Sequence, residues 1–281
     1  MNRLRHWFFR FGIFAVLLLS ARLSGCFGSP LPDTPLWPAA DLDWPMDHTG
    51  TRTVRLHVPP GFSMNAAADA MEKMVYPNGR PQDPHNVRKD LLLETLWPEM
   101  GPRTVANDKE FQVPGGGRTL SMLVSSGAVD PEIHTQDQLH VALQADIYVY
   151  LTDVCIPRLP ENAVCHHVNK LYKKPSKFGL KREGIDFSQF PDLPKDLYDH
   201  YDDIYYTPEL GGGLQTYIKC TADEVGPYAY GVRLSPQCQQ HFIFKPLNAA
   251  VKVTYRRVYL GDWQKIQVAV ETLLQSFITK Q

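Results

Sequence analysis

Residues 250–277 read AVKVTYRRVYLGDWQKIQVAVETLLQSF, a strand pattern followed by a helix pattern. In the first part Val251, Val253 and Tyr255 alternate with polar side chains, which is typical of a strand with one buried face. In the second part apolar residues recur at spacings of three and four, which predicts an amphipathic helix. They are Trp263, Ile266, Val270, Leu273, Leu274 and Phe277. With Asp262 placed to cap it, this helix would be roughly 25 Å long and could cover a small sheet.

The same alternation recurs elsewhere and predicts several more strands. They lie at about 54–58, 91–96, 119–124, 214–220, 228–234 and 240–244. The longest alternating run spans 139–151 and predicts a long strand of an antiparallel sheet with one wet face. Residues 66–75 predict a short helix. The predicted fold class is therefore α+β: mostly antiparallel sheet or sheets, with a few helices packed on one face and a C-terminal amphipathic helix.

Changes in composition along the chain suggest a division into segments. Residues 1–25 have the composition of a signal peptide, and the prolines of 26–50 indicate a stiff tether. Residues 51–170 would form an N-terminal α+β lobe. The lysines and prolines of 171–199 indicate a connecting excursion, and 200–281 would form a C-terminal α+β lobe.

The N-terminal segment combines arginines with an apolar run over 11–21 that is too short to span a bilayer. Its end, Leu23-Ser24-Gly25-Cys26, resembles the lipobox of bacterial lipoproteins. The resemblance implies that Cys26 is acylated, becomes the first mature residue and anchors the body in the periplasm. Phe27 is not the aspartate associated with inner-membrane retention, which favours the outer membrane. An ordinary cleaved signal and an uncleaved anchor are the alternatives.

Charge argues against nucleic acid as a partner. The chain has 29 basic and 30 acidic side chains, and residues 1–25 contain four arginines and no acid. The remainder therefore has 25 basic and 30 acidic side chains, a net charge of −5. Binding to phosphates needs a positive field, which this balance does not supply.

The chain has five cysteines, an odd number that needs an explanation in an exported protein. Acylation of Cys26 would leave an even set, which suits disulfides in an oxidising compartment. That set is Cys155, Cys165, Cys220 and Cys238. Three pairings are possible. We favour the local one, Cys155–Cys165 with Cys220–Cys238, because each pair brackets a loop-like segment.

A metal site is the alternative use of these cysteines. Cys165, His166 and His167 are consecutive, but adjacent histidines cannot easily point at one ion. No Cys-x-x-Cys spacing supplies further ligands. We therefore expect no metal.

Catalytic and cofactor signatures are absent from the sequence: there is no His-Glu-x-x-His, no P-loop and no dinucleotide fingerprint. We predict that the protein is not an enzyme and has no catalytic residues, no cofactor and no small-molecule substrate. Asp199, His200, Asp202 and Asp203 could hold a cation or act in acid–base catalysis, but nothing indicates that they converge.

The segment 196–209 mixes acids with tyrosines on an expected loop. One interpretation is a solvated loop. The other is a partner-binding patch, because tyrosines are enriched at protein interfaces. Its residues would be Tyr198, Asp199, Tyr201, Asp202, Asp203, Tyr205 and Tyr206. The tyrosines would act as anchors and the acids would steer a basic partner.

A second resemblance concerns the C-terminal part of the chain. It is carried by Cys220, Pro236-Gln237-Cys238-Gln239-Gln240-His241-Phe242, the strand through Val251, Val253 and Tyr255, Leu260-Gly261-Asp262-Trp263 and Leu274-Gln275-Ser276-Phe277. This pattern is similar to small lipoproteins of bacterial type VI secretion clusters, including immunity proteins that neutralise lipase and other periplasmic effectors. The resemblance implies a protein that neutralises a toxin in a 1:1 complex. The alternative is a structural or assembly lipoprotein of a secretion system or the envelope.

Overall fold

The computed structural model describes residues 33–47, 50–65, 90–113, 117–126, 139, 141–144, 171–189, 202–207, 214–224, 228–229, 232–233 and 235–279. The predicted signal peptide with Cys26, the predicted helix at 66–75 and the cysteines Cys155 and Cys165 lie outside these residues.

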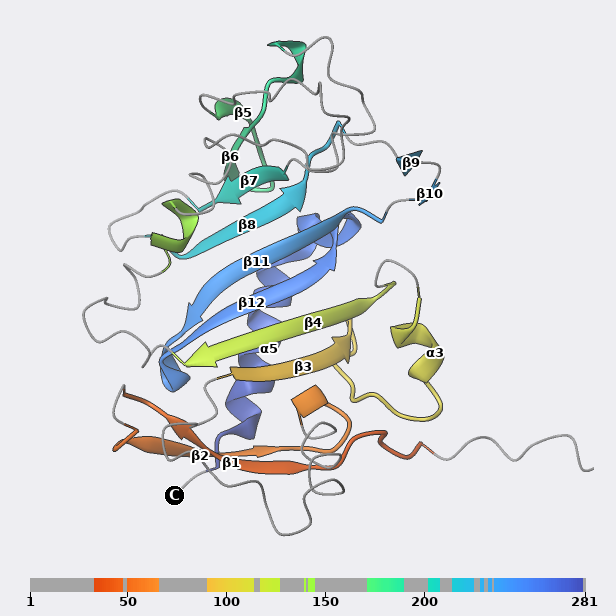
Figure 1. Cartoon of the computed structure of the whole chain (residues 1–281), viewed down its shortest axis with the longest axis vertical. Helices are drawn as coiled ribbons and strands as arrows, with labels where there is room; N and C mark the ends of the chain where they lie inside the picture. Colours follow the sequence, from red (N-terminus) through yellow and green to blue (C-terminus); the bar gives the residue numbers. More distant parts are fainter. Residues whose placement is uncertain are drawn as a thin grey trace, which may run out of the picture.

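The centre of the molecule is an antiparallel sheet of eight strands (Figure 1). In spatial order the strands are β3 (Asp90–Leu96), β4 (Thr119–Ser126), β12 (Ala249–Arg256), β11 (Gln237–Phe244), β8 (Thr216–Thr221), β7 (Asp202–Tyr206), β6 (Leu180–Gly184) and β5 (Tyr172–Lys177). Every neighbouring pair is antiparallel. The predicted α+β class is confirmed.

The C-terminal helix α5 (Trp263–Phe277) crosses one face of this sheet (Figure 1). Its apolar stripe is buried as the spacing predicts, except that Leu273 is only partly buried. Val251 and Val253 of β12 belong to the same core. Asp262 occupies the N-cap position but forms no capping hydrogen bond with its side chain. Its carboxylate instead accepts a hydrogen bond from Lys265 at 2.8 Å, so the predicted cap is wrong in its chemistry.

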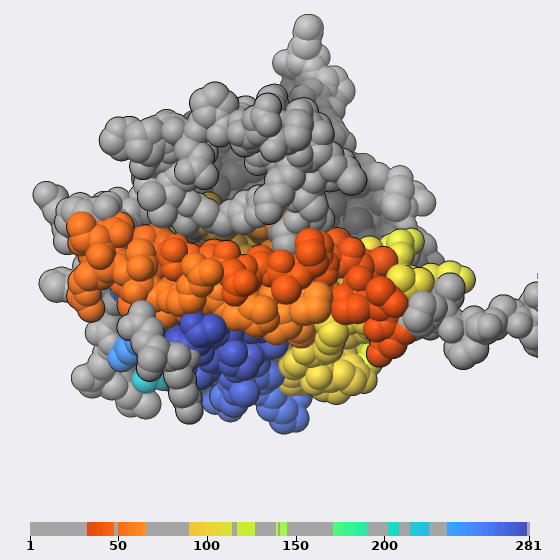
Figure 2. All heavy atoms as spheres, turned by 90° about the horizontal axis from the view of Figure 1, so that it is seen from below, coloured from red at the N-terminus to blue at the C-terminus, as the bar shows by residue number. Residues whose placement is uncertain are grey.

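A separate two-stranded sheet, β1 (Ala40–Pro45) with β2 (Thr53–Val58), lies beside α5, which is blue in Figure 2. Trp44 is completely buried, and its indole N–H donates to the carbonyl of Leu247 at 2.9 Å. The predicted tether over 26–50 is therefore wrong for β1. The reason is that the free energy gained by burying the large indole of Trp44 exceeds what the extended proline-rich segment would gain by staying solvated.

The predicted division into two lobes is also wrong. β12 pairs with β4 on one side and with β11 on the other, so segments assigned to both lobes belong to one sheet. The predicted connecting excursion at 171–199 contains the hairpin of β5 and β6, which forms an edge of that sheet. Few apolar side chains mark these strands. Leu180 is fully buried, but most of the other residues are lysine, arginine or proline.

The predicted strand at 139–151 is wrong where the structure describes it, because residues 139 and 141–144 are helical. Leu139 and Leu143 are buried in a second core, which also contains Ile204 and Tyr217. Two leucines four residues apart lie on one face of a helix but also fit an alternating strand, so the pattern over this range was ambiguous.

The remaining described elements are short. They are α3 (Asp108–Phe111), η4 (Phe187–Gln189), β9 (Tyr228–Ala229), β10 (Val232–Arg233), η6 (Lys245–Leu247) and η7 (Arg257–Asp262). The predicted strand at 228–234 is thus the small hairpin of β9 and β10. Among the described helices, none combines the length and apolar character needed to cross a membrane.

Candidate functional site

The predicted partner-binding patch lies partly inside the sheet. Asp203 and Tyr205 are completely buried in β7, so the predicted surface role is wrong for both residues. Asp202 and Tyr206 are partly exposed, and the hydroxyl of Tyr206 donates to Glu183 at 2.7 Å. The other predicted members, Tyr198, Asp199 and Tyr201, lie outside the described residues, as does His200.

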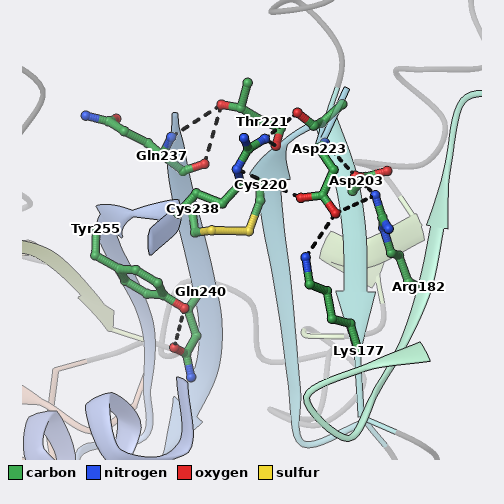
Figure 3. Close-up of a disulfide and its surroundings, with 12 residues drawn as sticks. Lys177, Arg182, Asp203, Cys220, Thr221, Asp223, Gln237, Cys238, Gln240 and Tyr255 are labelled. Atoms are coloured by element: carbon green, nitrogen blue, oxygen red, sulfur yellow. Dashed lines mark hydrogen bonds and ion pairs between the residues drawn. A yellow bond between two sulfur atoms is a disulfide. The ribbon is translucent and has the colours of Figure 1, made fainter. Parts of the chain in front are cut away.

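Asp203 is the centre of a buried network of charges (Figure 3). Its carboxylate accepts hydrogen bonds from Lys174 at 2.8 Å and Arg182 at 2.5 Å, and from the backbone N–H of Asp223 at 3.0 Å. The side chains of Lys174 and Arg182 are only 12% and 11% exposed. Because these residues come from β5, β6 and β7, the network ties three strands together with charge rather than apolar contact.

Gly184 shows how closely the network is packed. A Cβ atom at this position would lie 2.1 Å from a carboxylate oxygen of Asp203. No side chain fits in that space, so the carboxylate needs glycine on the neighbouring strand. Tyr205 follows Asp203 along β7, and its ring lies 5.5 Å from the guanidinium of Arg182.

Asp223 extends the network toward the surface. Its carboxylate lies 3.0 Å from Lys177, 3.1 Å from Arg182 and 3.9 Å from Arg257. Burial opposes ionisation, but the hydrogen bond from Lys177 and the charges of Arg182 and Arg257 outweigh it, so the pKa of Asp223 lies below its usual value. Burial likewise disfavours the charge of Arg182, yet the hydrogen bond and charge of Asp203 outweigh this and raise the pKa of Arg182.

A disulfide joins Cys220 of β8 to Cys238 of β11 beside this network (Figure 3). The two residues are directly opposite in the strand register, and both are completely buried. This confirms the predicted pairing of Cys220 with Cys238. On the same side of the sheet, the hydroxyl of Tyr255 donates to the side-chain oxygen of Gln240 at 3.0 Å.

Arg257 fixes the chain that leaves β8. Its guanidinium donates to the backbone carbonyl of Thr221 at 2.6 Å and also to the carbonyl of Ala222. The disulfide, the Asp203 network and Arg257 together hold this end of the sheet in one arrangement. We call it the locked end, defined by Asp203, Cys220, Asp223, Cys238 and Arg257.

A groove of about 400 Å³ opens at the locked end, between the β5–β6 turn and η7. Phe178 and Val258 contribute exposed apolar surface to it and are 47% and 72% exposed, while Leu260 is buried. Three cations also line the groove, together with the carboxylate of Asp223. These cations are Lys177, Arg256 and Arg257.

Phe178 has an unusual backbone. Lys177 pairs with Leu180, so Phe178 and Gly179 form a two-residue turn in which both have positive φ, 54° and 78°. Turns of this kind favour Asn-Gly, because a bulky side chain is strained at positive φ. The carbonyl of Phe178 accepts a hydrogen bond from the indole of Trp263 at 3.1 Å.

The ring of Phe178 is positioned at the rim of the groove. It lies so close to Gly261 that a Cβ atom there would be 3.3 Å from the ring, and the Lys177 ammonium lies 5.4 Å from its centroid. Sequence reasoning missed this residue. The available signal was Phe-Gly in a place where a hairpin turn normally has Asn-Gly.

The described residues contain no group of three or more histidines, cysteines or acids arranged to hold a metal ion. The locked end presents an exposed aromatic ring, an exposed valine and several cations around one groove.

No protein-family model and no curated protein matches the chain. A solved structure with some likeness is that of an immunity protein of the Stenotrophomonas maltophilia type IV secretion system. The two are 16% identical, with a TM-score of 0.49 over 90% of this chain and 98% of that chain. A likeness at this level does not by itself carry a shared function.

Proposed function

We propose that the protein is a lipid-anchored component of the bacterial envelope that binds a toxic effector in the periplasm and neutralises it. The observation that carries the proposal is the locked end, where a disulfide and a buried ion network hold an exposed apolar and cationic groove in place. A binding surface that is already ordered loses less conformational entropy when its partner docks, so more of the contact energy remains as affinity.

Two sequence features support the same proposal. The lipobox-like Leu23-Ser24-Gly25-Cys26 supports anchoring, with the outer membrane favoured by Phe27. The resemblance of the C-terminal part to type VI secretion-associated immunity lipoproteins supports an effector of that system, a lipase being one candidate. An inhibitor of this kind needs only to occlude its target in a 1:1 complex and has no need of catalytic residues.

Affinity capture from the native bacterium tests the function. The full chain, tagged at its C-terminus, is purified from detergent-solubilised envelopes, and bound proteins are identified and quantified by mass spectrometry. We expect one secreted toxin in equimolar amount, encoded beside this gene. Recovery of secretion-machine or envelope components in its place would support the assembly lipoprotein and contradict our proposal.

The anchor is tested separately by Cys26→Ser. Two or more acyl chains give near-permanent membrane attachment. We therefore expect the variant in the soluble periplasmic fraction and the parent protein in membranes. Retention of the variant in membranes would contradict lipid anchoring and indicate an uncleaved helix.

A further inference from the structure

We propose that the groove between the β5–β6 turn and η7 is the effector-binding surface, and that it receives a protein segment in which an apolar side chain is flanked by carboxylates. This inference rests on the proposed function and adds the surface and the chemistry of the partner. We call this surface the Phe178 groove, defined by Lys177, Phe178, Arg256, Arg257 and Val258.

The Phe178 groove exposes apolar side chains to solvent. Phe178 and Val258 approach the groove from different elements, the β5–β6 turn and η7, and each leaves a large part of its surface in solvent. Leu260 adds a buried apolar wall. An aromatic side chain beside a concave apolar surface is typical of the centre of a protein interface.

The charged side chains of the groove are mostly cations. Of the charged side chains that line the groove, three are cations and one is a carboxylate, Asp223. Asp223 is already engaged by Lys177 and Arg182. The guanidinium of Arg256 forms no ion pair with any residue that the structure describes. A partner that brings carboxylates would therefore supply charges that the groove lacks.

This polarity is opposite to the one predicted from the sequence. The acids of 199–203 were expected to steer a basic partner, but Asp203 is buried and its charge is satisfied by Lys174 and Arg182. At the rim of the locked end, the cationic side chains of Lys177 and Arg257 are 41% and 20% exposed.

The backbone of Phe178 is strained. Phe178 adopts a positive φ that asparagine or glycine would adopt more easily, and nearly half of its side chain remains exposed. Asparagine at position 178 would therefore leave the turn less strained than phenylalanine does. A strained position occupied by an exposed aromatic ring is accounted for if the ring contacts a partner.

The test uses the full chain in detergent and a defined probe. The probe is a synthetic peptide, Asp-Glu-Phe-Leu-Glu-Asp with blocked ends, and its counterpart has lysine at every acidic position. Binding is followed through the indole ¹H–¹⁵N signals of the protein. The indole of Trp263 donates to the carbonyl of Phe178, so its signal reports on the groove, whereas the buried Trp44 serves as an internal control.

Three variants make the test specific. Phe178→Asn removes the ring and suits the turn, and Arg256→Glu reverses a charge that lines the groove. Val268→Asn changes an exposed apolar residue of α5 that does not line the groove. We expect the acidic peptide to shift the Trp263 signal and leave Trp44 in place. Phe178→Asn and Arg256→Glu should each weaken its binding about tenfold, as loss of a central interface contact does, and Val268→Asn should not.

Equal binding of the basic peptide, or unchanged binding of the acidic peptide to both groove variants, would overturn the inference. So would the absence of any shift of the Trp263 signal at millimolar peptide. These outcomes are separate from failure of the proposed function. If the full chain captures a toxin and both groove variants capture it equally well, the function stands and the groove assignment is wrong. If the parent protein captures no toxin, the proposed function fails whatever the peptide does.

Discussion

Asp203→Asn is the substitution whose effect follows most directly from the structure. Asp203 is completely buried, and its carboxylate lies within 2.8 Å of the nearly buried Lys174 and Arg182. Removing one partner of a buried ion pair costs about 3–5 kcal/mol because the remaining charge stays desolvated. Arg182 still has Asp223 at 3.1 Å, and Lys174 still has Glu224 at 2.9 Å. We therefore expect a loss near the lower limit, about 3 kcal/mol.

This loss is measured by urea unfolding, monitored by circular dichroism. The parent protein and the variant must have equal m-values for the comparison to hold. Asp262→Asn is the matched control, because Asp262 forms a surface ion pair with Lys265 and their side chains are 37% and 76% exposed. Such a surface pair contributes about 0.5 kcal/mol or less. A loss below about 1 kcal/mol for Asp203→Asn would refute the network as a stabilising element.

Three further predictions concern the surroundings of the same carboxylate. Tyr205→Phe should stabilise the protein by about 1 kcal/mol in urea unfolding, because the Tyr205 hydroxyl is buried with no hydrogen-bond partner among the described residues; a destabilised variant would contradict this. Gly184→Ala should lower stability by about 2 kcal/mol, because its methyl group would collide with Asp203, and an unchanged melting temperature would show that the space exists. Replacing both Cys220 and Cys238 by alanine should lower the free energy of unfolding by about 3 kcal/mol, because the disulfide closes a loop with a sequence separation of 18. The measurement is made without reductant, and equal stability of parent and variant would argue against a stabilising role for this disulfide.

The parts of the fold that were predicted correctly are those in which apolar side chains carry the pattern. The alternation in β12 and the stripe of α5 correspond to burial in a single core, so their periods are direct evidence of structure. The edge strands β5 and β6 were missed because charged side chains stabilise them. Lys174 and Arg182 stabilise these strands through their ion pairs with Asp203. A single sequence does not show which charged side chains will pair in the fold.

The predicted partner-binding patch was wrong at Asp203 and Tyr205 for the same reason. A cluster of acids and tyrosines has the same composition whether it is exposed or buried against cations, and β7 proved to be buried at Asp203 and Tyr205. The other large error is the strand predicted at 139–151. It arose because Leu139 and Leu143 fit one face of a helix as well as one face of an alternating strand. The disulfide Cys220–Cys238 was predictable because the two cysteines are close in sequence and bracket a loop-like segment.

The measurement that tests our account most directly is protection from the captured effector. The toxin recovered with the full chain is directed to the periplasm of a sensitive host, alone or together with the parent protein, Phe178→Asn or Arg256→Glu, each at matched abundance. Our account predicts that the parent protein restores growth and that both groove variants protect less well at the same abundance. Continued killing in the presence of the parent protein would contradict neutralisation, and equal protection by both variants would place the binding surface elsewhere.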